Sequence, residues 1–229
     1  MEVNTNMNPY SQGIARTSAS ALATNKVLRN TYALLSVTML FSAVMAGVSM
    51  MLQTGPATNL FSFLGSIALI WLVLPRTANS AAGIAVVFGI TGLLGFGLGP
   101  VLNAYMHMTH GSQIIMTAMG GTGMIFLGLS AYALTTKKDF SFLGGMLFAG
   151  FMVVLIAAIV NIFLAIPAVS LAISAAVIMI MSGFILFDTS RIIHGGETNY
   201  ILATVSMYLN IYNIFISLLQ ILGVFGNDD

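Results

Sequence analysis

The sequence predicts an all-α membrane protein, a seven-transmembrane-helix bundle with the last helix central. Of its 229 residues, 58% are hydrophobic and 6% are charged, and the mean hydropathy is +0.99. In soluble domains about a quarter of the residues are charged. The apolar residues gather into seven runs, and the polar residues of the last run recur on one helical face.

Each apolar run approaches the length of about 20 residues that a helix needs to cross roughly 30 Å of hydrocarbon. The runs cover residues 31–52, 57–74, 81–102, 112–134, 142–164, 168–188 and 200–225. The second run is the shortest, and the turn at residues 165–167 is tight and apolar. A six-span arrangement with one re-entrant segment therefore remains an alternative.

Residues 1–30 precede the first run and are rich in Asn, Ser, Thr and Ala, without the apolar periodicity that could bury a core. We expect a flexible cytoplasmic tail here, followed by a transmembrane domain at residues 31–229. The first run begins too late for a cleavable signal peptide and is long enough to span the membrane.

The basic residues predict the orientation of the chain. The opposite loops, at residues 53–56, 103–111 and 165–167, contain no Lys or Arg, and by the positive-inside rule they lie outside. The N-terminus is then cytoplasmic and the C-terminus external. A seven-span chain places all of its basic residues on the cytoplasmic side: Arg16, Lys26, Arg29, Arg76, Lys137, Lys138 and Arg191.

Glycines inside two runs allow helices to approach one another closely. Gly95 and Gly99 form a small-xxx-small pair in the third run, and residues 120–123 hold three glycines near the middle of the fourth. Close backbone packing explains both sets. The alternative for residues 120–123 is a helix break near the bilayer midplane, as in transporters that bind substrate there.

Few residues could support catalysis. The absence of cysteine excludes thiol chemistry, and the scattered basic residues exclude a nucleic-acid binder. An intramembrane aspartyl protease needs two carboxylates, and a serine protease needs a histidine within the membrane, whereas His107, His110 and His194 all lie in loops. His107 and His110 alone make a weak metal site. We expect no enzymatic activity, no cofactor and no metal.

Asp188 is the only acidic residue that touches any apolar run. A carboxylate at full membrane depth costs about 2.5 to 3.5 kcal/mol on insertion scales, so it needs a partner. The candidate partners are Arg191, one turn further on, and Arg76 at the end of the second run. Such a pair could be a structural anchor at the membrane interface or a protonation-dependent latch.

The last run carries a polar stripe, because its polar residues recur at spacings of four and three and so share one helical face. We expect this helix to be enclosed by the other six, with its polar side inward and Asp188 near one end. The stripe either forms interhelical hydrogen bonds, at about 0.6 kcal/mol each, or lines a water-filled path. Its members are Ser206, Asn210, Asn213, Ser217 and Gln220.

Four stretches resemble the Bax inhibitor family of membrane proteins. They are KVLRNTY at 26–32, SAY at 130–132 joined to KKDFSFLGG at 137–145, ILFDTS at 185–190, and HGGETNY at 194–200. The resemblance implies a seven-helix bundle with the last helix central. It is strongest to the bacterial YccA-like branch of the inner membrane, whose members are named as modulators of the membrane AAA protease FtsH. A tail in the cytosol would give such a protease a handle, and a tightly packed bundle would resist extraction.

Some family members are described as pH-sensitive calcium leak channels in which an aspartate at the end of the sixth helix pairs with one in the seventh. Asp188 matches the first, but Asn210 stands where the second would be. An amide neither shares a proton nor adds charge for Ca²⁺. The resemblance therefore favours a protease modulator, with a calcium or proton leak as the alternative. The candidate gate or pH-sensing residues are Asp188, Asn210, Asn213, Arg76 and Arg191.

Overall fold

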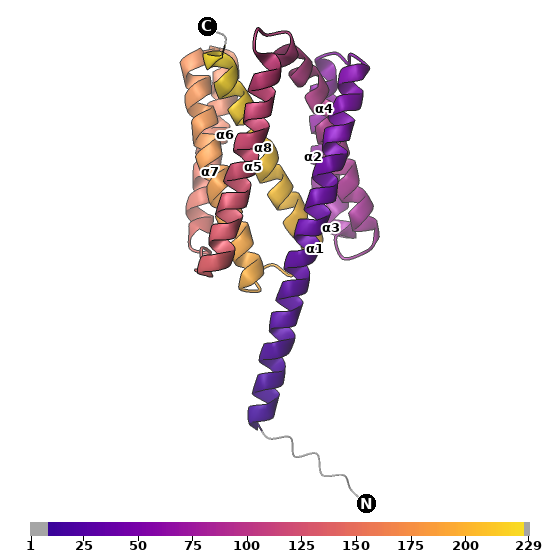
Figure 1. Ribbon diagram of the computed structural model, residues 1–229, viewed down its shortest axis with the longest axis vertical. Helices are drawn as coiled ribbons and strands as arrows, with labels where there is room; N and C mark the ends of the chain where they lie inside the picture. The colour runs from indigo at the N-terminus through magenta and orange to yellow at the C-terminus, as the bar shows by residue number, and fades with distance from the viewer. Residues whose placement is uncertain (1–8, 227–229) are drawn as a thin grey trace, which may run out of the picture.

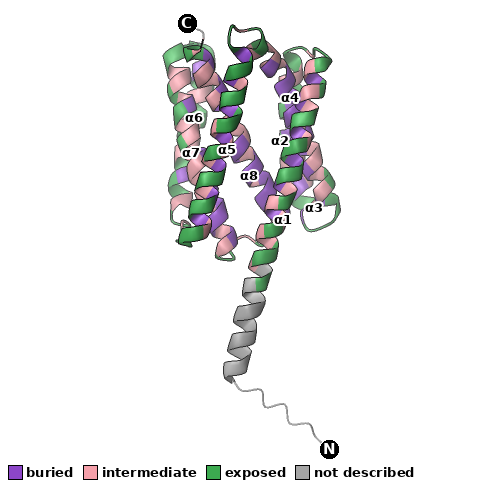
Figure 2. Ribbon diagram, viewed as in Figure 1, coloured by how far each residue is buried: buried purple, intermediate pink, exposed green. Residues whose placement is uncertain are grey.

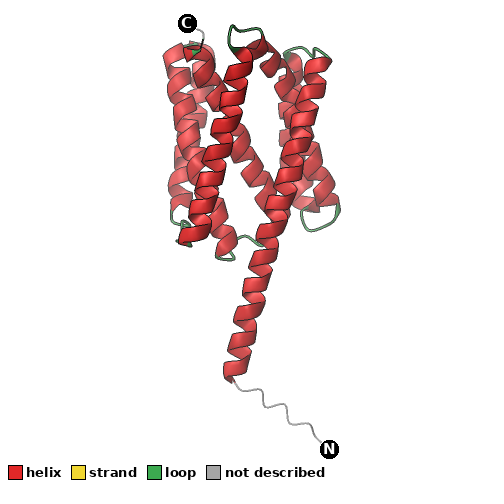
Figure 3. Cartoon of the chain, in the orientation of Figure 1, coloured by secondary structure: helices red, strands yellow, loops and turns green. Residues whose placement is uncertain are grey.

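The computed structural model describes residues 9–226, with side chains described for residue 22 and from residue 24 onward. Every regular element in this range is helical, and the helices are joined by short loops (Figure 3). The elements are α1 (Pro9–Met51), α2 (Ala57–Ala68), the π-helical segment η1 (Leu69–Val73), α3 (Leu74–Thr77), α4 (Ala82–Met106), α5 (Gly111–Thr136), α6 (Leu143–Leu164), α7 (Pro167–Ile193) and α8 (Tyr200–Phe225).

Seven helical stretches in the described range are long and apolar enough to cross a membrane, which confirms the predicted fold class. One of the seven is composite, because α2, η1 and α3 follow one another without a break over Ala57–Thr77. The six-span alternative with a re-entrant segment is therefore wrong. The sixth span continues past its predicted end to Ile193, so Asp188 lies inside a helix rather than at its terminus.

The first helix begins well before its predicted start at residue 31. α1 extends without interruption from Pro9 to Met51, and its N-terminal part projects from the bundle (Figure 1). Residues 9–30 are thus helical, and the flexibility expected of residues 1–30 stays a prediction. Extending an existing helix by one residue costs little compared with nucleating a new one, and proline is well tolerated at a helix start. Residues 1–8 lie outside the described range, and the cytoplasmic location of the tail stays a prediction.

The last helix occupies the centre of the bundle. α8 packs against α1, α4, α5 and α7, while α2 and α6 lie at the periphery, against α4 and α7 respectively. Figure 1 shows α8 crossing obliquely between the group α5, α6 and α7 and the group α1 to α4. In Figure 2 the buried residues concentrate on α8 and α4. The expectation that all six other helices would enclose α8 is wrong in one respect, since α8 contacts four of them.

Close packing at Gly95 and Gly99 is confirmed. An added Cβ at Gly95 would lie 2.8 Å from the Cα of Ser42 in α1, and one at Gly99 would lie 2.9 Å from the carbonyl carbon of Ser49. Only glycine permits this approach between α1 and α4, which we call the α1–α4 seam. The seam holds the first helix of the chain in place.

The glycines at residues 120–123 behave differently. α5 is continuous through them, so the interpretation as a helix break is wrong. A Cβ at Gly120 or Gly123 would meet no atom within 4 Å, and only at Gly121 would it approach a neighbour, Leu218. Two of the three glycines therefore serve no close contact with the residues that the structure describes.

The basic side chains that the structure describes gather at one end of the bundle. Lys26 and Arg29 lie in the first part of α1, and the others lie at the ends of α3, α5 and α7 or in the loops that follow. The two ends of the described range lie at opposite ends of the bundle (Figure 1), as an odd number of spans requires. The structure thus brings together the basic residues on which the predicted orientation rests, and the orientation itself stays a prediction.

Candidate functional site

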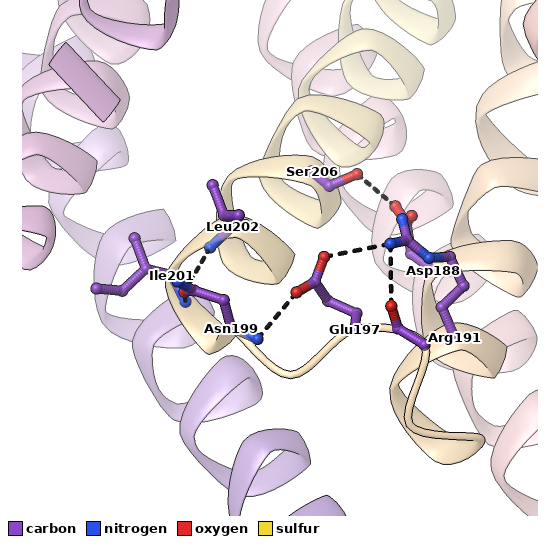
Figure 4. A network of polar contacts seen from close by, with 8 residues as sticks. Asp188, Arg191, Glu197, Asn199, Ile201, Leu202 and Ser206 are labelled. Atoms are coloured by element: carbon purple, nitrogen blue, oxygen red, sulfur yellow. Dashed lines mark hydrogen bonds and ion pairs between the residues drawn. The ribbon is translucent and has the colours of Figure 1, made fainter. Parts of the chain in front are cut away.

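Asp188 is buried in α7 and is held by two side chains from α8. Its Oδ2 atom accepts hydrogen bonds from Ser206 Oγ at 2.6 Å and from Asn210 Nδ2 at 2.8 Å. The two donors lie one turn apart on the same face of α8, and both belong to the predicted polar stripe. Figure 4 shows Ser206 directed from α8 toward the carboxylate. The stripe and the carboxylate are therefore brought together as predicted.

The expected partners Arg191 and Arg76 are engaged elsewhere. Arg191 pairs with Glu197 at 3.4 Å (Figure 4). Its guanidinium also lies over the Phe187 ring, 5.5 Å from the ring centroid. Arg76 donates to the carbonyl of Leu72 in its own helix. Among the described residues, Asp188 therefore forms neither of the predicted ion pairs. Glu197 lies in the α7–α8 loop, beyond the end of α7, where an arginine keeps more of its hydration than beside Asp188 within the helix.

The rest of the polar stripe makes separate contacts. Gln220 accepts a hydrogen bond from Ser174 of α7 at 2.8 Å, and Ser217 is buried. Asn213 donates to the carbonyl of Leu209 in its own helix at 2.8 Å and does not join Asp188. Interhelical hydrogen bonding thus accounts for Ser206, Asn210 and Gln220.

Tyr208 of α8 is buried and forms hydrogen bonds with two other helices, which the sequence analysis did not predict. Tyr208 OH donates to the carbonyl oxygen of Thr91 in α4 at 3.3 Å, so the hydroxyl of Ser42 in α1, at 2.6 Å, is the donor to Tyr208. Tyr208 lies two residues after Ser206 and so falls on another face of α8, outside the stripe. The expected central position of α8 was the one signal that could have pointed to Tyr208, because a helix covered on several sides also buries polar groups off its main stripe.

At the basic end, two of the quoted motifs meet through Ser190. The buried Ser190 Oγ accepts the N–H of Phe140 at 2.8 Å, which fixes the α5–α6 loop against the end of α7. In that loop, hydrogen bonds from the side chain and backbone of Ser141 lower the pKa of Asp139 below its usual value, and the charge of His194 adds to the effect. His194 Nδ1 lies 2.9 Å from the carbonyl oxygen of Ser190 and so donates to it.

Asn199 organises the start of α8. Its Oδ1 atom accepts the N–H groups of Ile201 at 2.9 Å and of Leu202 at 3.3 Å, which caps the helix (Figure 4). Its Nδ2 group donates to the carbonyl of Ala78 at 2.9 Å, and this links the α7–α8 loop to the α3–α4 loop. Through Asn199, the HGGETNY motif therefore caps the N-terminus of α8 and connects the α7–α8 loop to the α3–α4 loop.

The comparisons with known proteins agree with the motifs. A relative from Vibrio cholerae serotype O1, called an uncharacterized membrane protein, is 50% identical over 99% of this chain and 100% of its own length. A relative from Escherichia coli strain K12, named modulator of FtsH protease YccA, is 54% identical over 91% of this chain and 94% of its own length. In Escherichia coli O6:H1 a relative with the same identity and coverage is named inner membrane protein YccA. The model of the family described as inhibitor of apoptosis-promoting Bax1 matches residues 24–227, and this multi-pass membrane protein belongs to that Bax inhibitor family.

Proposed function

We propose that this protein is a non-enzymatic inner-membrane protein that binds and modulates the membrane AAA protease FtsH. The observation that carries the proposal is the relationship to the Escherichia coli protein named as a modulator of that protease, which is 54% identical over nearly the whole of both chains. The name belongs to the relative, and the structure adds a physical route by which this chain could act in the same way.

The route begins at the N-terminus. An AAA protease pulls its substrates by an accessible terminus, and residues 1–23 precede the first candidate span, Thr24–Met51. α1 projects from the basic end of the bundle (Figure 1). With the basic end facing the cytosol, this segment is within reach of the protease.

Pulling on the N-terminus would act first on the helix that is held most firmly. α1 packs against α4 along the α1–α4 seam and also contacts α7 and α8. Four interhelical hydrogen bonds add to this packing: Ser42 to Tyr208 at 2.6 Å, Tyr32 with Thr189 at 3.4 Å, Thr204 to the carbonyl of Thr31 at 3.4 Å, and Asn103 to the carbonyl of Met50 at 3.3 Å. At about 0.6 kcal/mol each, these bonds contribute less than the close backbone packing. A chain that is engaged but extracted slowly occupies the enzyme, and this lowers the turnover of other substrates.

The proposal is tested by co-purification with the protease and by the half-life of a second substrate. We expect the protein to co-purify and to lengthen that half-life, and we expect deletion of residues 1–24 to slow its own degradation. A control variant carries a Gly/Ser segment of equal length in place of residues 1–24, which should restore degradation if the segment serves as a handle. Absence of both binding and altered turnover would refute the proposal.

The calcium or proton leak is less well supported by the geometry. Calcium sites use six to eight oxygen ligands, whereas Asn210 directs its N–H₂ group, not its oxygen, toward Asp188. The described residues contain no group of three or more His, Asp or Glu side chains that could hold a metal ion. A leak would appear as pH-dependent calcium flux into liposomes that Asp188→Asn abolishes, and an absence of flux at every pH would remove this alternative.

A further inference from the structure

The α5–α6 loop presents two neighbouring lysines in a fixed conformation. Lys137 ends α5 with φ 51° and ψ 22°, in the left-handed region that favours glycine. The loop that follows is anchored by the hydrogen bond from Phe140 N–H to the buried Ser190 at 2.8 Å. Ala165 at the end of α6 and Gln53 after α1 adopt the same left-handed conformation, so this backbone shape ends the helix and fixes where the loop begins, and does not by itself mark a function.

Neither lysine is neutralised by the described residues around it. The ion pair in the described part of the chain joins Arg191 to Glu197, so Glu197 already has a partner. Asp139 follows the two lysines, but its carboxylate accepts the N–H of Ser141 at 2.8 Å and faces Ser190 and His194. The ammonium groups of Lys137 and Lys138 are therefore exposed and available to an external anion.

The surroundings of the lysines identify the source of that anion. The loop joins two candidate membrane spans, Gly111–Thr136 and Leu143–Leu164. From the ends of these spans we infer that it lies at the level of the lipid headgroups. Two aromatic side chains flank it, Tyr132 at 48% exposure and Phe142 at 77% exposure. Exposed aromatic rings beside a span end are typical of the membrane interface, and lysines at this level contact anionic lipid headgroups.

We propose that Lys137 and Lys138 bind the phosphate of an anionic phospholipid whose acyl chains lie against the outer faces of α5 and α6. The site is independent of protease binding. Its affinity comes from the two ammonium groups, and its selectivity comes from the negative charge of the lipid. Each lysine contributes about a five-fold preference for an anionic over a zwitterionic lipid, or about twenty-five-fold for the pair.

The test measures binding of phosphatidylglycerol and of phosphatidylcholine to the purified full-length protein in detergent, by native mass spectrometry. In the double variant Lys137→Gln/Lys138→Gln, the ratio of the affinity for phosphatidylglycerol to that for phosphatidylcholine should fall about twenty-five-fold. The matched control Lys26→Gln/Arg29→Gln removes the same charge from exposed positions on α1 and should lose markedly less. If the control loses as much, the charge of the whole basic end explains binding and the proposal is overturned.

A second variant separates binding from folding. Lys137→Gly relieves the left-handed strain, so it should raise the melting temperature in detergent by about 2 °C while lowering the phosphatidylglycerol preference about five-fold. An unchanged preference would overturn the proposal. Inorganic phosphate at millimolar concentration should not displace phosphatidylglycerol, because it lacks acyl chains. Displacement by phosphate would show a free-anion site and would overturn the assignment to lipid.

Discussion

Replacing Gly95 by alanine tests the α1–α4 seam directly. An added Cβ would lie 2.8 Å from the Cα of Ser42 and closer still to its carbonyl oxygen, and both atoms belong to the backbone of α1. No side-chain rotation can relieve such a contact, so the two helices must separate. Overpacking of this kind costs about 1 to 3 kcal/mol.

Alanine also gains helix propensity over glycine, by about 0.8 to 1 kcal/mol, and this gain would partly hide the cost. Gly123→Ala supplies the matched control, since it makes the same change in the middle of α5 where a Cβ meets nothing within 4 Å. The difference between the two variants cancels the propensity gain and isolates the steric cost. We therefore expect Gly95→Ala to be about 1 to 3 kcal/mol less stable than Gly123→Ala.

The assay is equilibrium unfolding of both variants in the same detergent, followed by their half-lives in cells that contain the protease. Gly95→Ala should unfold earlier and should be degraded faster, because a loosened α1 is easier to extract. Equal stability of the two variants would refute the close approach of α1 and α4. Lower stability with an unchanged half-life would keep the seam but refute its role in resisting extraction.

Three further perturbations test the contacts at the basic end. Because hydrogen bonding holds the folded-state pKa of Asp139 below 3.8, its ionised form stabilises the fold above that pH, and this contribution is lost as the pH falls through the folded-state pKa. The melting temperatures of the wild type and Asp139→Asn should therefore differ by a constant amount well above pH 3.8 and converge as the pH falls below it, and a gap that stays constant at low pH would contradict this. Ser190→Ala leaves the N–H of Phe140 without its partner, at a cost of about 1 to 3 kcal/mol, and hydrogen exchange at that amide should accelerate. Asn199→Ala removes the cap of α8 and should cost about 0.5 to 2 kcal/mol in unfolding free energy, whereas Asn199→Asp should retain most of the cap.

The sequence was sufficient for the spans and for the inward face of the last helix, because both depend on local periodicity and length. Two stripe residues, Asn210 and Ser217, are each 5% exposed, as their spacing predicted. The other three, Ser206, Asn213 and Gln220, are half-buried. Gly95 could be placed in a helix contact for the same reason, since a small residue repeated after four positions marks a helix face. The helical start at Pro9 was missed because residues 9–30 carry no apolar pattern, and the helix there is an extension of the span that follows.

The partners of Asp188 could not be predicted, because they depend on how two helices pack. The sequence offered Arg191 one turn away, but the α7–α8 loop folds back and gives that arginine a carboxylate at Glu197. The hydroxyl of Ser206 reaches Asp188 only because the start of α8 lies beside the end of α7. Tyr208 was missed for a related reason, since a helix covered on several sides buries polar groups off its main stripe.

A substitution at Asp188 distinguishes the two candidate functions, a protease modulator and an ion leak. Asp188→Asn keeps one oxygen that can accept from Ser206 or Asn210, so the packing of α7 on α8 should survive. A leak through this site depends on the carboxylate and should disappear in the variant. Resistance to extraction depends on α1, which is pulled first, and should remain. If the Asp188→Asn variant still lengthens the half-life of a second protease substrate, modulation depends on the packing of the bundle and its first helix. If the variant no longer lengthens that half-life, modulation requires the buried carboxylate of Asp188.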